Sequence, residues 1–275
     1  MQNTPINKIN WFPGHMKKAT DEIKQRLNCV DLIIEVVDSR CIHSSSNMDL
    51  IKIINNKLHL KIALKSDLSL LNEQYQTDLI ITNTKNKQNR NKIISIFYKI
   101  FEDKINKYKL KGLVNPKFTL MIIGLPNVGK SSLINFLKSK NNLVVRNLPG
   151  VTKNQRIVNI NENFDLIDTP GILFKNINDI NTAYKLSLIN TIKKEVLPIE
   201  DVVKFGFNYL FSNFYEKLKI FYKIEDFNNY YDFLNLVANR YKYITKNAEL
   251  DINRVISRVF NDLIDCKISK VNYDF

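Results

Sequence analysis

Glycine, cysteine and long apolar runs are all scarce in this sequence. Its 275 residues include only 7 glycines and 3 cysteines. Cys29, Cys41 and Cys266 are odd in number and lack metal-ligand spacing, so we expect reduced thiols. No apolar run approaches the length of a membrane span, and the opening stretch MQNTPINKIN lacks the apolar segment of a signal peptide. We therefore expect a cytoplasmic protein without a membrane partner, in a bacterial cytosol rather than an organelle.

Positive charge is in excess. Lysine and arginine number 41 against 27 acidic residues, which gives a formal net charge of +14. Such an excess points first to nucleic acid as a partner. An equally open interpretation is that lysines simply cover the surface of a lysine-rich protein. The hydrophobic content of 44% is ordinary for a globular protein with one large or two medium domains.

Short aliphatic segments alternate with helical patterns in the first part of the chain, which predicts an α/β fold with a doubly wound, mainly parallel sheet. The predicted strands are residues 31–37, 60–64, 79–82, 118–123, 156–160 and 164–167. The predicted helices are 47–55, 70–76, 91–107 and 130–137. Beyond about residue 180 the sequence is aromatic, basic and helical in pattern, with Pro198 opening a helix. We expect one domain at 1–178 and a small all-helical domain at 179–275.

The strongest motif is GLPNVGKS at residues 124–131, which fits the phosphate-loop pattern G-x-x-x-x-G-K-[ST] between a predicted strand and a predicted helix. Backbone N–H groups of such a loop surround phosphate oxygens, and its glycines permit a wrap that a Cβ would obstruct. Lys130 is predicted to bridge the β- and γ-phosphates, and the Ser131 hydroxyl to bind Mg²⁺. The predicted nucleotide contacts in this loop are Asn127, Val128, Gly129, Lys130, Ser131 and Ser132.

Two motifs downstream of the loop extend this nucleotide site. Asp168-Thr-Pro-Gly171 follows the strand FDLI, so Asp168 is placed to hold the Mg²⁺ shell through water and the Gly171 N–H to meet the γ-phosphate. A turn-only interpretation is disfavoured because proline is unfavourable at its third position. The stretch PGVT at 149–152 supplies Thr152, a predicted nucleotide contact and second Mg²⁺ ligand.

The guanine-recognition pattern Asn-Lys-x-Asp has its nearest counterpart upstream of the phosphate loop. In KIALKSDLS (61–69), Lys65 and Asp67 follow a predicted strand, with Leu64 at the asparagine position. Asp67 would accept hydrogen bonds from guanine N1–H and N2–H₂, which adenine cannot offer. The next strand ends in Asn83 and Thr84, predicted to contact the base from its other side. This order predicts a circularly permuted P-loop GTPase domain that binds GTP and GDP. The alternatives are an ordinary strand followed by a polar turn and, because Leu64 replaces the asparagine, a decayed guanine site.

With its motifs in this order, the chain resembles the circularly permuted GTPases of the ribosome biogenesis GTPase A (YlqF) family over essentially its whole length. The most specific match is WFPGHM at 11–16, followed by a basic helix and a strand ending VVDSR. The resemblance implies a GTPase that acts in late assembly of the large ribosomal subunit, with a C-terminal domain that binds ribosomal RNA. We expect a monomer in solution.

The hydrolytic groups are less evident from the sequence. Ile172 follows Gly171, where Ras-type GTPases use a glutamine to orient the attacking water, so intrinsic hydrolysis should be slow. The family resemblance points to His15, in the N-terminal loop, as a catalytic residue, whereas the residues alone favour a structural role at a helix entry. Asn127 resembles the asparagine of potassium-activated GTPases, whose oxygen helps bind K⁺, although it could instead only brace the loop.

Leu64 is the main departure from the family. The family asparagine joins the base loop to the phosphate loop and touches the base; leucine is expected to do neither, which weakens nucleotide binding while Asp67 keeps the guanine preference. Two functions stay open. One is a GTP-hydrolysing assembly factor stimulated by the ribosomal particle. The other is a nucleotide-gated RNA-binding scaffold with little turnover, which Leu64 and Ile172 favour.

Overall fold

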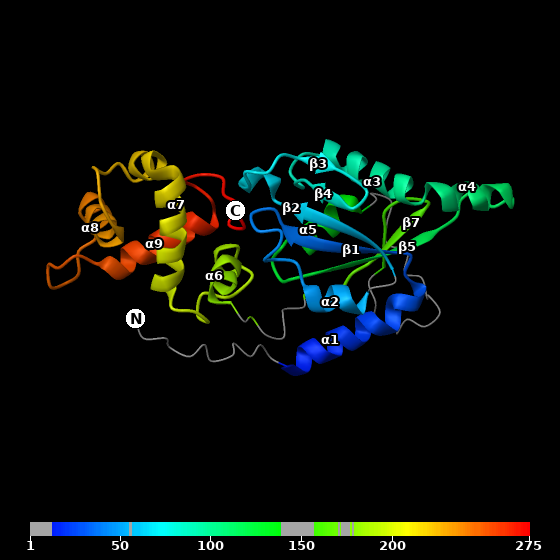
Figure 1. The fold of residues 1–275 in the computed structure, drawn as a ribbon, viewed down its shortest axis with the longest axis horizontal. Coiled ribbons are helices and arrows are strands. Elements are labelled where there is room, and N and C mark those ends of the chain that lie inside the picture. Colours follow the sequence, from blue (N-terminus) through cyan, green and yellow to red (C-terminus); the bar gives the residue numbers. More distant parts are fainter. Residues whose placement is uncertain (1–12, 55–56, 139–156, 170, 172–176, 178) are drawn as a thin grey trace. The chain divides into compact units, whose positions relative to one another are not determined.

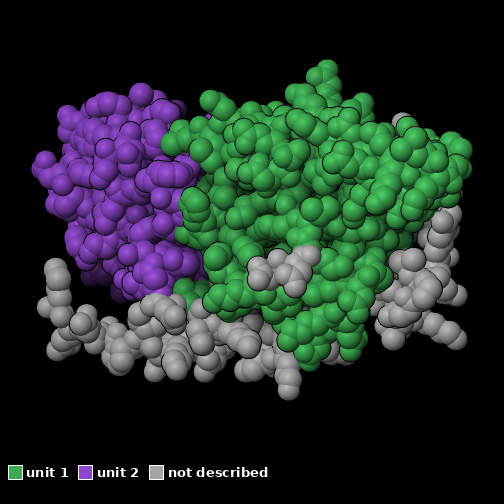
Figure 2. Space-filling model, turned by 45° about the vertical axis from the view of Figure 1, so that its right-hand side comes forward, with its two compact units in different colours: residues 1–178 green, residues 179–275 purple. Residues whose placement is uncertain are grey.

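A computed structural model describes residues 13–54, 57–138, 157–169, 171, 177 and 179–275, with side chains from Thr20 onward. The chain forms two compact units, Met1–Asn178 and Asp179–Phe275 (Figure 2). The first unit contains the sheet and the second is helical.

Within the described residues, seven strands form one sheet in the order β3-β4-β2-β1-β5-β7-β6. The strands are β1 (Leu32–Asp38), β2 (Leu58–Leu64), β3 (Gln74–Tyr75), β4 (Leu79–Ile81), β5 (Phe118–Gly124), β6 (Ile157–Asn159) and β7 (Phe164–Ile167). The edge strands β3 and β6 are antiparallel and the other pairings are parallel. From β1 the chain proceeds through β2 and β4 to one side, then returns through β5 and β7 to the other. The β1/β5 boundary is therefore a topological switch point, where doubly wound folds bind their ligands.

Helices cover both faces of this sheet (Figure 1). They are α1 (Pro13–Arg26), α2 (Met48–Ile53), α3 (Gln88–Ile100), α4 (Glu102–Leu110) and α5 (Lys130–Leu137). Alternate side chains of β5 face opposite ways, as a strand requires. Met121 packs in a cluster with Ile23 of α1 and Leu50 of α2, whereas Phe118 stacks on Phe101 at 4.2 Å on the other face.

The doubly wound, mainly parallel fold is confirmed, but two predicted helices are wrong. Residues 70–76 contain the strand β3 instead of a helix, because the Gln76 N–H bonds Leu79 O to close an antiparallel hairpin and the Tyr75 hydroxyl bonds that of Thr82. The helix predicted at 91–107 is divided into α3 and α4. The break is at Phe101 (φ −99°, ψ 7°), whose fully buried ring anchors the junction on the sheet.

The second unit is built from α6 (Ile180–Leu188), α7 (Ile199–Tyr222), α8 (Tyr230–Arg240) and α9 (Ile252–Ile264). Helix α7 begins directly after Pro198, as the sequence predicts. A Cβ on Gly206 would lie 2.8 Å from Leu263 Cδ1, so α7 and α9 pack closely at this glycine. Among the helices that the structure describes, none combines the length and apolar character that crossing a bilayer demands.

Candidate nucleotide-binding site

The phosphate loop begins where β5 presses against the central strand β1. Gly124 has φ +147°, and a Cβ placed on it would lie 2.3 Å from the carbonyl oxygen of Val36. Because that neighbour is backbone and not a flexible side chain, no other residue fits without moving a strand. The loop is therefore fixed at the topological switch point.

The rest of the loop leads directly into α5. Gly129 (φ +111°) caps the helix, and Asn127 is also left-handed at φ +60°. Val128 is buried, whereas Ser131 and Ser132 lie exposed in the first helical turn. The first N–H groups of a helix have no acceptor within it and attract anions. These residues form the cradle that a phosphate group needs.

Lys130 is held over this cradle by the loop itself. Its Nζ donates to Leu125 O at 2.7 Å and to Gly124 O at 3.1 Å, and the side chain is only 9% exposed. Burial lowers the pKa of Lys130 to about 8, although the charge of Asp168 acts in the opposite direction. A Cβ on Gly171 would lie 3.0 Å from the same Nζ, so the structure brings Lys130, Asp168 and Gly171 together as predicted from the sequence.

The predicted Mg²⁺ ligands are present only in part. Ser131 and Asp168 offer hydroxyl and carboxylate oxygens, which suit a hard cation that also binds nucleotide phosphates. Thr152 and Ile172 lie outside the described residues. His15 belongs to α1, not to the loop expected from the family resemblance, and its side chain is outside the described part. The described donors fit a magnesium–nucleotide complex.

The predicted base-recognition residues lie at the ends of β2 and β4. Lys65 adopts a left-handed conformation (φ 64°) directly after β2, and Asp67 follows in the short 3₁₀ turn Ser66–Leu68. The Asp67 carboxylate forms a 2.6 Å ion pair with Lys85, a residue in the loop after β4, close to Thr84. This solvent-accessible pair spans the two loops that are predicted to contact the base.

Asn83 braces the same pair of loops. Its Nδ2 donates to Glu73 Oε1 at 2.7 Å and to Ser66 Oγ at 3.2 Å. Its Oδ1 accepts from the backbone N–H groups of Lys85 and Asn86. Asn83 thus fixes the loops' geometry, and Glu73, which the sequence did not single out, acts as their common hydrogen-bond acceptor.

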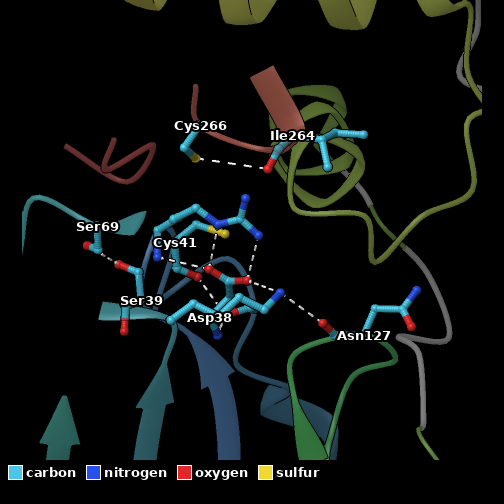
Figure 3. Close-up of polar contacts among 10 residues, drawn as sticks. Asp38, Ser39, Cys41, Ser69, Asn127, Ile264 and Cys266 are labelled. Carbon is cyan, nitrogen blue, oxygen red and sulfur yellow. Dashed lines mark hydrogen bonds and ion pairs between the residues drawn. The ribbon is translucent and has the colours of Figure 1, made fainter. Parts of the chain in front are cut away.

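Two contacts join the predicted base-recognition loop to the phosphate loop. Lys65 Nζ donates to Asn127 O at 2.9 Å and pairs with Asp38 Oδ2 at 2.8 Å (Figure 3). Leu64 contributes the second contact, since its Cδ1 would lie 2.8 Å from a Cβ on Gly129. The expectation that leucine cannot join the two loops is therefore wrong in one respect: Leu64 makes the join by apolar packing instead of a hydrogen bond.

Comparisons with known proteins agree with this geometry. A family model described as "50S ribosome-binding GTPase" matches residues 119–226. A protein of Mycoplasma pneumoniae named "Probable ribosome biogenesis GTPase A" is 40% identical over 273 residues, covering 98% of each chain. The chain belongs to the ribosome biogenesis GTPase A family. "Ribosome biogenesis GTPase A" of Bacillus licheniformis is 34% identical over 227 residues, which cover 79% of this chain and 80% of that one.

The fold of this ribosome biogenesis GTPase A member also matches a solved structure. GNP-bound YlqF from T. maritima has a TM-score of 0.61 at 22% identity, covering 93% of this chain and 97% of that chain. The family model begins at residue 119, after β2 and β4. The strands that lead to the predicted base-recognition residues precede the phosphate loop along the chain, so the circularly permuted fold is confirmed, whereas the base contacts themselves stay predictions.

Sequence reasoning did not assign a role to two further residues of this family member. Asp38 ends β1 and Arg40 follows it, and both are buried at the switch point. The available signal was the polar VVDSR ending of an otherwise apolar strand. Because carboxyl ends of parallel strands meet at one edge, that ending had to lie beside Lys65 and the phosphate loop.

The lowered pKa of Lys130 predicts a pH dependence of nucleotide binding. Phosphate oxygens favour the ammonium form, so binding takes up a proton wherever Lys130 is neutral in the free protein. The pKa of Lys130 in the free protein is about 8, so affinity for GDP should be constant below that pH. Above it, the affinity should fall by up to about tenfold per pH unit.

Isothermal titration calorimetry at several pH values measures this change in affinity, and repeating it in buffers of different ionisation enthalpy measures the proton uptake. The Lys130→Arg variant keeps its charge throughout and reports the nucleotide's own titration; a wild-type slope equal to that of this variant would contradict the assignment.

Proposed function

We propose that this chain binds and hydrolyses GTP in the cytosol as a late assembly factor of the large ribosomal subunit. The observation that carries the proposal is the single site formed by the phosphate loop and the upstream Lys65–Asp67 turn, joined through Lys65. The names of its full-length relatives, ribosome biogenesis GTPases, support the cellular process.

Each site residue predicted from the sequence has a role in this proposal. Lys130 and the N-terminus of α5 bind the phosphates, while Asp67 accepts hydrogen bonds from the guanine edge. Ser131, Thr152 and Asp168 would hold Mg²⁺, which, when bound, neutralises charge on the phosphates. The Gly171 N–H would meet the γ-phosphate of bound GTP. Lys65, Asn83 and Thr84 form the walls of the base pocket.

Hydrolysis requires a group that positions water, and we assign this role to His15. The exposed Asn127 side chain, in the phosphate loop itself, is our candidate ligand for K⁺. A cation there would stabilise charge that develops during phosphoryl transfer. Replacing K⁺ by Na⁺ is therefore expected to slow hydrolysis.

The helical unit carries the proposed contact with ribosomal RNA. The Tyr241 and Tyr243 rings stack at 5.9 Å, with the Arg258 guanidinium 3.7 Å from the Tyr241 centroid and that of Arg254 4.4 Å from Tyr243. Guanidinium groups on aromatic rings suit recognition of phosphates and unstacked bases. Tyr222, by contrast, is fully buried and bonds Asp262, so it belongs to the core.

Steady-state GTP hydrolysis tests the proposal. The wild-type protein is assayed alone, with large subunits and with small subunits, in K⁺ and in Na⁺. We expect stimulation of at least about a hundredfold by large subunits only, a threshold below the roughly 10³- to 10⁵-fold that an arginine finger supplies in other GTPases. His15→Ala should lose the stimulation but still bind GDP, whereas His59→Ala, at the far end of β2 from Lys65, should keep it.

The same assay separates the second candidate function, an RNA-binding scaffold with little turnover. Nucleotide-dependent binding to large subunits without stimulated hydrolysis would support the scaffold. Leu64 is weak support for the scaffold, because its packing on Gly129 keeps the two loops joined.

A further inference from the structure

A buried carboxylate lies at the centre of the join between the two loops. Asp38 is fully buried at the carboxyl end of β1. Its Oδ1 accepts from Arg40 Nε at 2.9 Å and from Arg40 N at 3.1 Å, and its Oδ2 accepts from Arg40 Nη2 at 2.8 Å. Lys65 Nζ lies 2.8 Å from the same Oδ2. Arg40 thus binds the carboxylate from its own loop, while Lys65 reaches it from the neighbouring strand.

The lysine continues from this carboxylate to the phosphate loop. The Lys65 ammonium contacts Asp38 on one side and the carbonyl of Asn127, 2.9 Å away, on the other. Figure 3 shows Asp38 and Asn127 at the two ends of this bridge. We call Asp38, Lys65 and Asn127 the lysine bridge. It connects the end of β1, the base-recognition turn after β2 and the loop after β5, which are the three segments that meet at the switch point.

We infer that Asp38 is a positioning residue for guanine nucleotide binding: its carboxylate fixes the Lys65 ammonium on the phosphate loop and supplies the polar join that Leu64 cannot make. The inference rests on the proposed function, because it assigns how that nucleotide site is assembled. Without the carboxylate, the cations of Arg40 and Lys65 would repel each other, and Lys65 would lose its fixed position.

The electrostatics of the bridge agree with this role. Burial alone would raise the pKa of Asp38, but the hydrogen bonds and charges of Arg40 and Lys65 hold it below its ordinary value. Asp38 therefore remains ionised, and a buried ionised group fixes the position of its partners strongly. Lys65 itself is held in a left-handed backbone conformation that a lysine rarely adopts, which also indicates a position set by its surroundings.

The neighbouring acid on the same strand provides a matched control. Glu35 is 1% exposed and is opposite Lys61 of β2 in the sheet register, as Asp38 is opposite Leu64. Its carboxylate binds Ser46 Oγ at 2.8 Å and lies 3.7 Å from Lys61 Nζ. Glu35 is thus a buried, lysine-paired acid between the same strands, but its partners Ser46, Asn47, His59 and Lys61 lie before or at the N-cap of α2 and in β2, not in the phosphate loop.

The test compares GDP dissociation constants and thermal unfolding midpoints of Asp38→Asn, Lys65→Met, the double variant and Glu35→Gln. We expect Asp38→Asn and Lys65→Met each to weaken GDP binding by about 10- to 100-fold, the loss expected for a charge-assisted contact. The double variant should be no weaker than the worse single variant, because both remove one bridge. Glu35→Gln should lower the unfolding midpoint but change GDP affinity less than about threefold.

Three outcomes would overturn the inference. These are an unchanged GDP affinity in Lys65→Met, multiplicative losses in the double variant, or an equal loss in Glu35→Gln. Lys65, whose side chain is 27% exposed, can be replaced with less risk to folding than Asp38, so the bridge stays testable if Asp38→Asn fails to fold. A wild-type protein that binds GDP but is not stimulated by large subunits would contradict the proposed function and leave the lysine bridge intact.

Discussion

In the Asp67→Asn variant, affinity for GTP is expected to fall by at least about a hundredfold while affinity for xanthosine triphosphate rises. In the proposed site, the Asp67 carboxylate would offer two acceptors to the N1–H and N2–H₂ donors of guanine. An asparagine would place an N–H₂ group against one of those donors and leave it unpaired. Xanthine carries a carbonyl where guanine has its amino group, so it matches the asparagine. Competition binding with GTP, XTP and ATP measures the change.

Two variants distinguish this effect from loss of the Asp67–Lys85 ion pair. Lys85→Ala removes the 2.6 Å pair but keeps the carboxylate, so it should retain guanine selectivity. Asp78→Asn makes the same chemical change at an exposed acid in the same unit and should have no effect. If Asp67→Asn kept its preference for GTP over XTP, the base would have to be recognised elsewhere.

Gly124→Ala is expected to destabilise the first unit by at least about 3 kcal/mol and to remove nucleotide binding. The new Cβ would meet the Val36 carbonyl oxygen at 2.3 Å, so the phosphate loop and β1 must separate. For a unit of this size, we expect the unfolding midpoint to fall by about 6–12 °C in a calorimetric scan.

Gly112→Ala is the matched control for that substitution. Gly112 also has a left-handed backbone (φ +83°), but nothing lies within 4 Å of a Cβ placed there. Gly112→Ala should lower the free energy of unfolding only by the strain of a left-handed alanine, about 1–2 kcal/mol. It should leave GDP binding unchanged. Equal effects of the two substitutions would show that strain, and not the contact with Val36, makes Gly124 necessary.

The sequence predicted the parts of this fold that depend on local pattern. Apolar strands and the phosphate-loop motif are local signals, and β1, β2, β5 and α5 lie within a few residues of their predicted ranges. The helix predicted at 70–76 failed because β3 depends on cross-strand partners, including the Tyr75–Thr82 hydroxyl contact, that no local propensity encodes.

In the candidate site, too, residues within local motifs could be predicted, whereas contacts between distant segments could not. Lys130, Asp168 and Gly171 could be placed by motif, and the structure brings them together. The polar end of β1 could be placed beside Lys65 from the parallel strand pattern, but the Asp38–Lys65 contact itself depends on the register of β1 with β2, which the sequence does not show. The sequence shows only that Leu64 lacks the hydrogen bond of an asparagine. Its packing on Gly129 depends on how closely the two loops approach in space.

Hydrogen–deuterium exchange with GDP and with ADP tests the central claim most directly, namely that segments on both sides of the permutation form one guanine site. We expect GDP to protect peptides covering residues 64–69 and 83–86 together with those covering 124–132. ADP at the same concentration should protect neither the peptides covering 64–69 nor those covering 83–86. Protection confined to the phosphate loop, or equal protection by ADP, would mean that the upstream turn is an ordinary polar turn and not a guanine site.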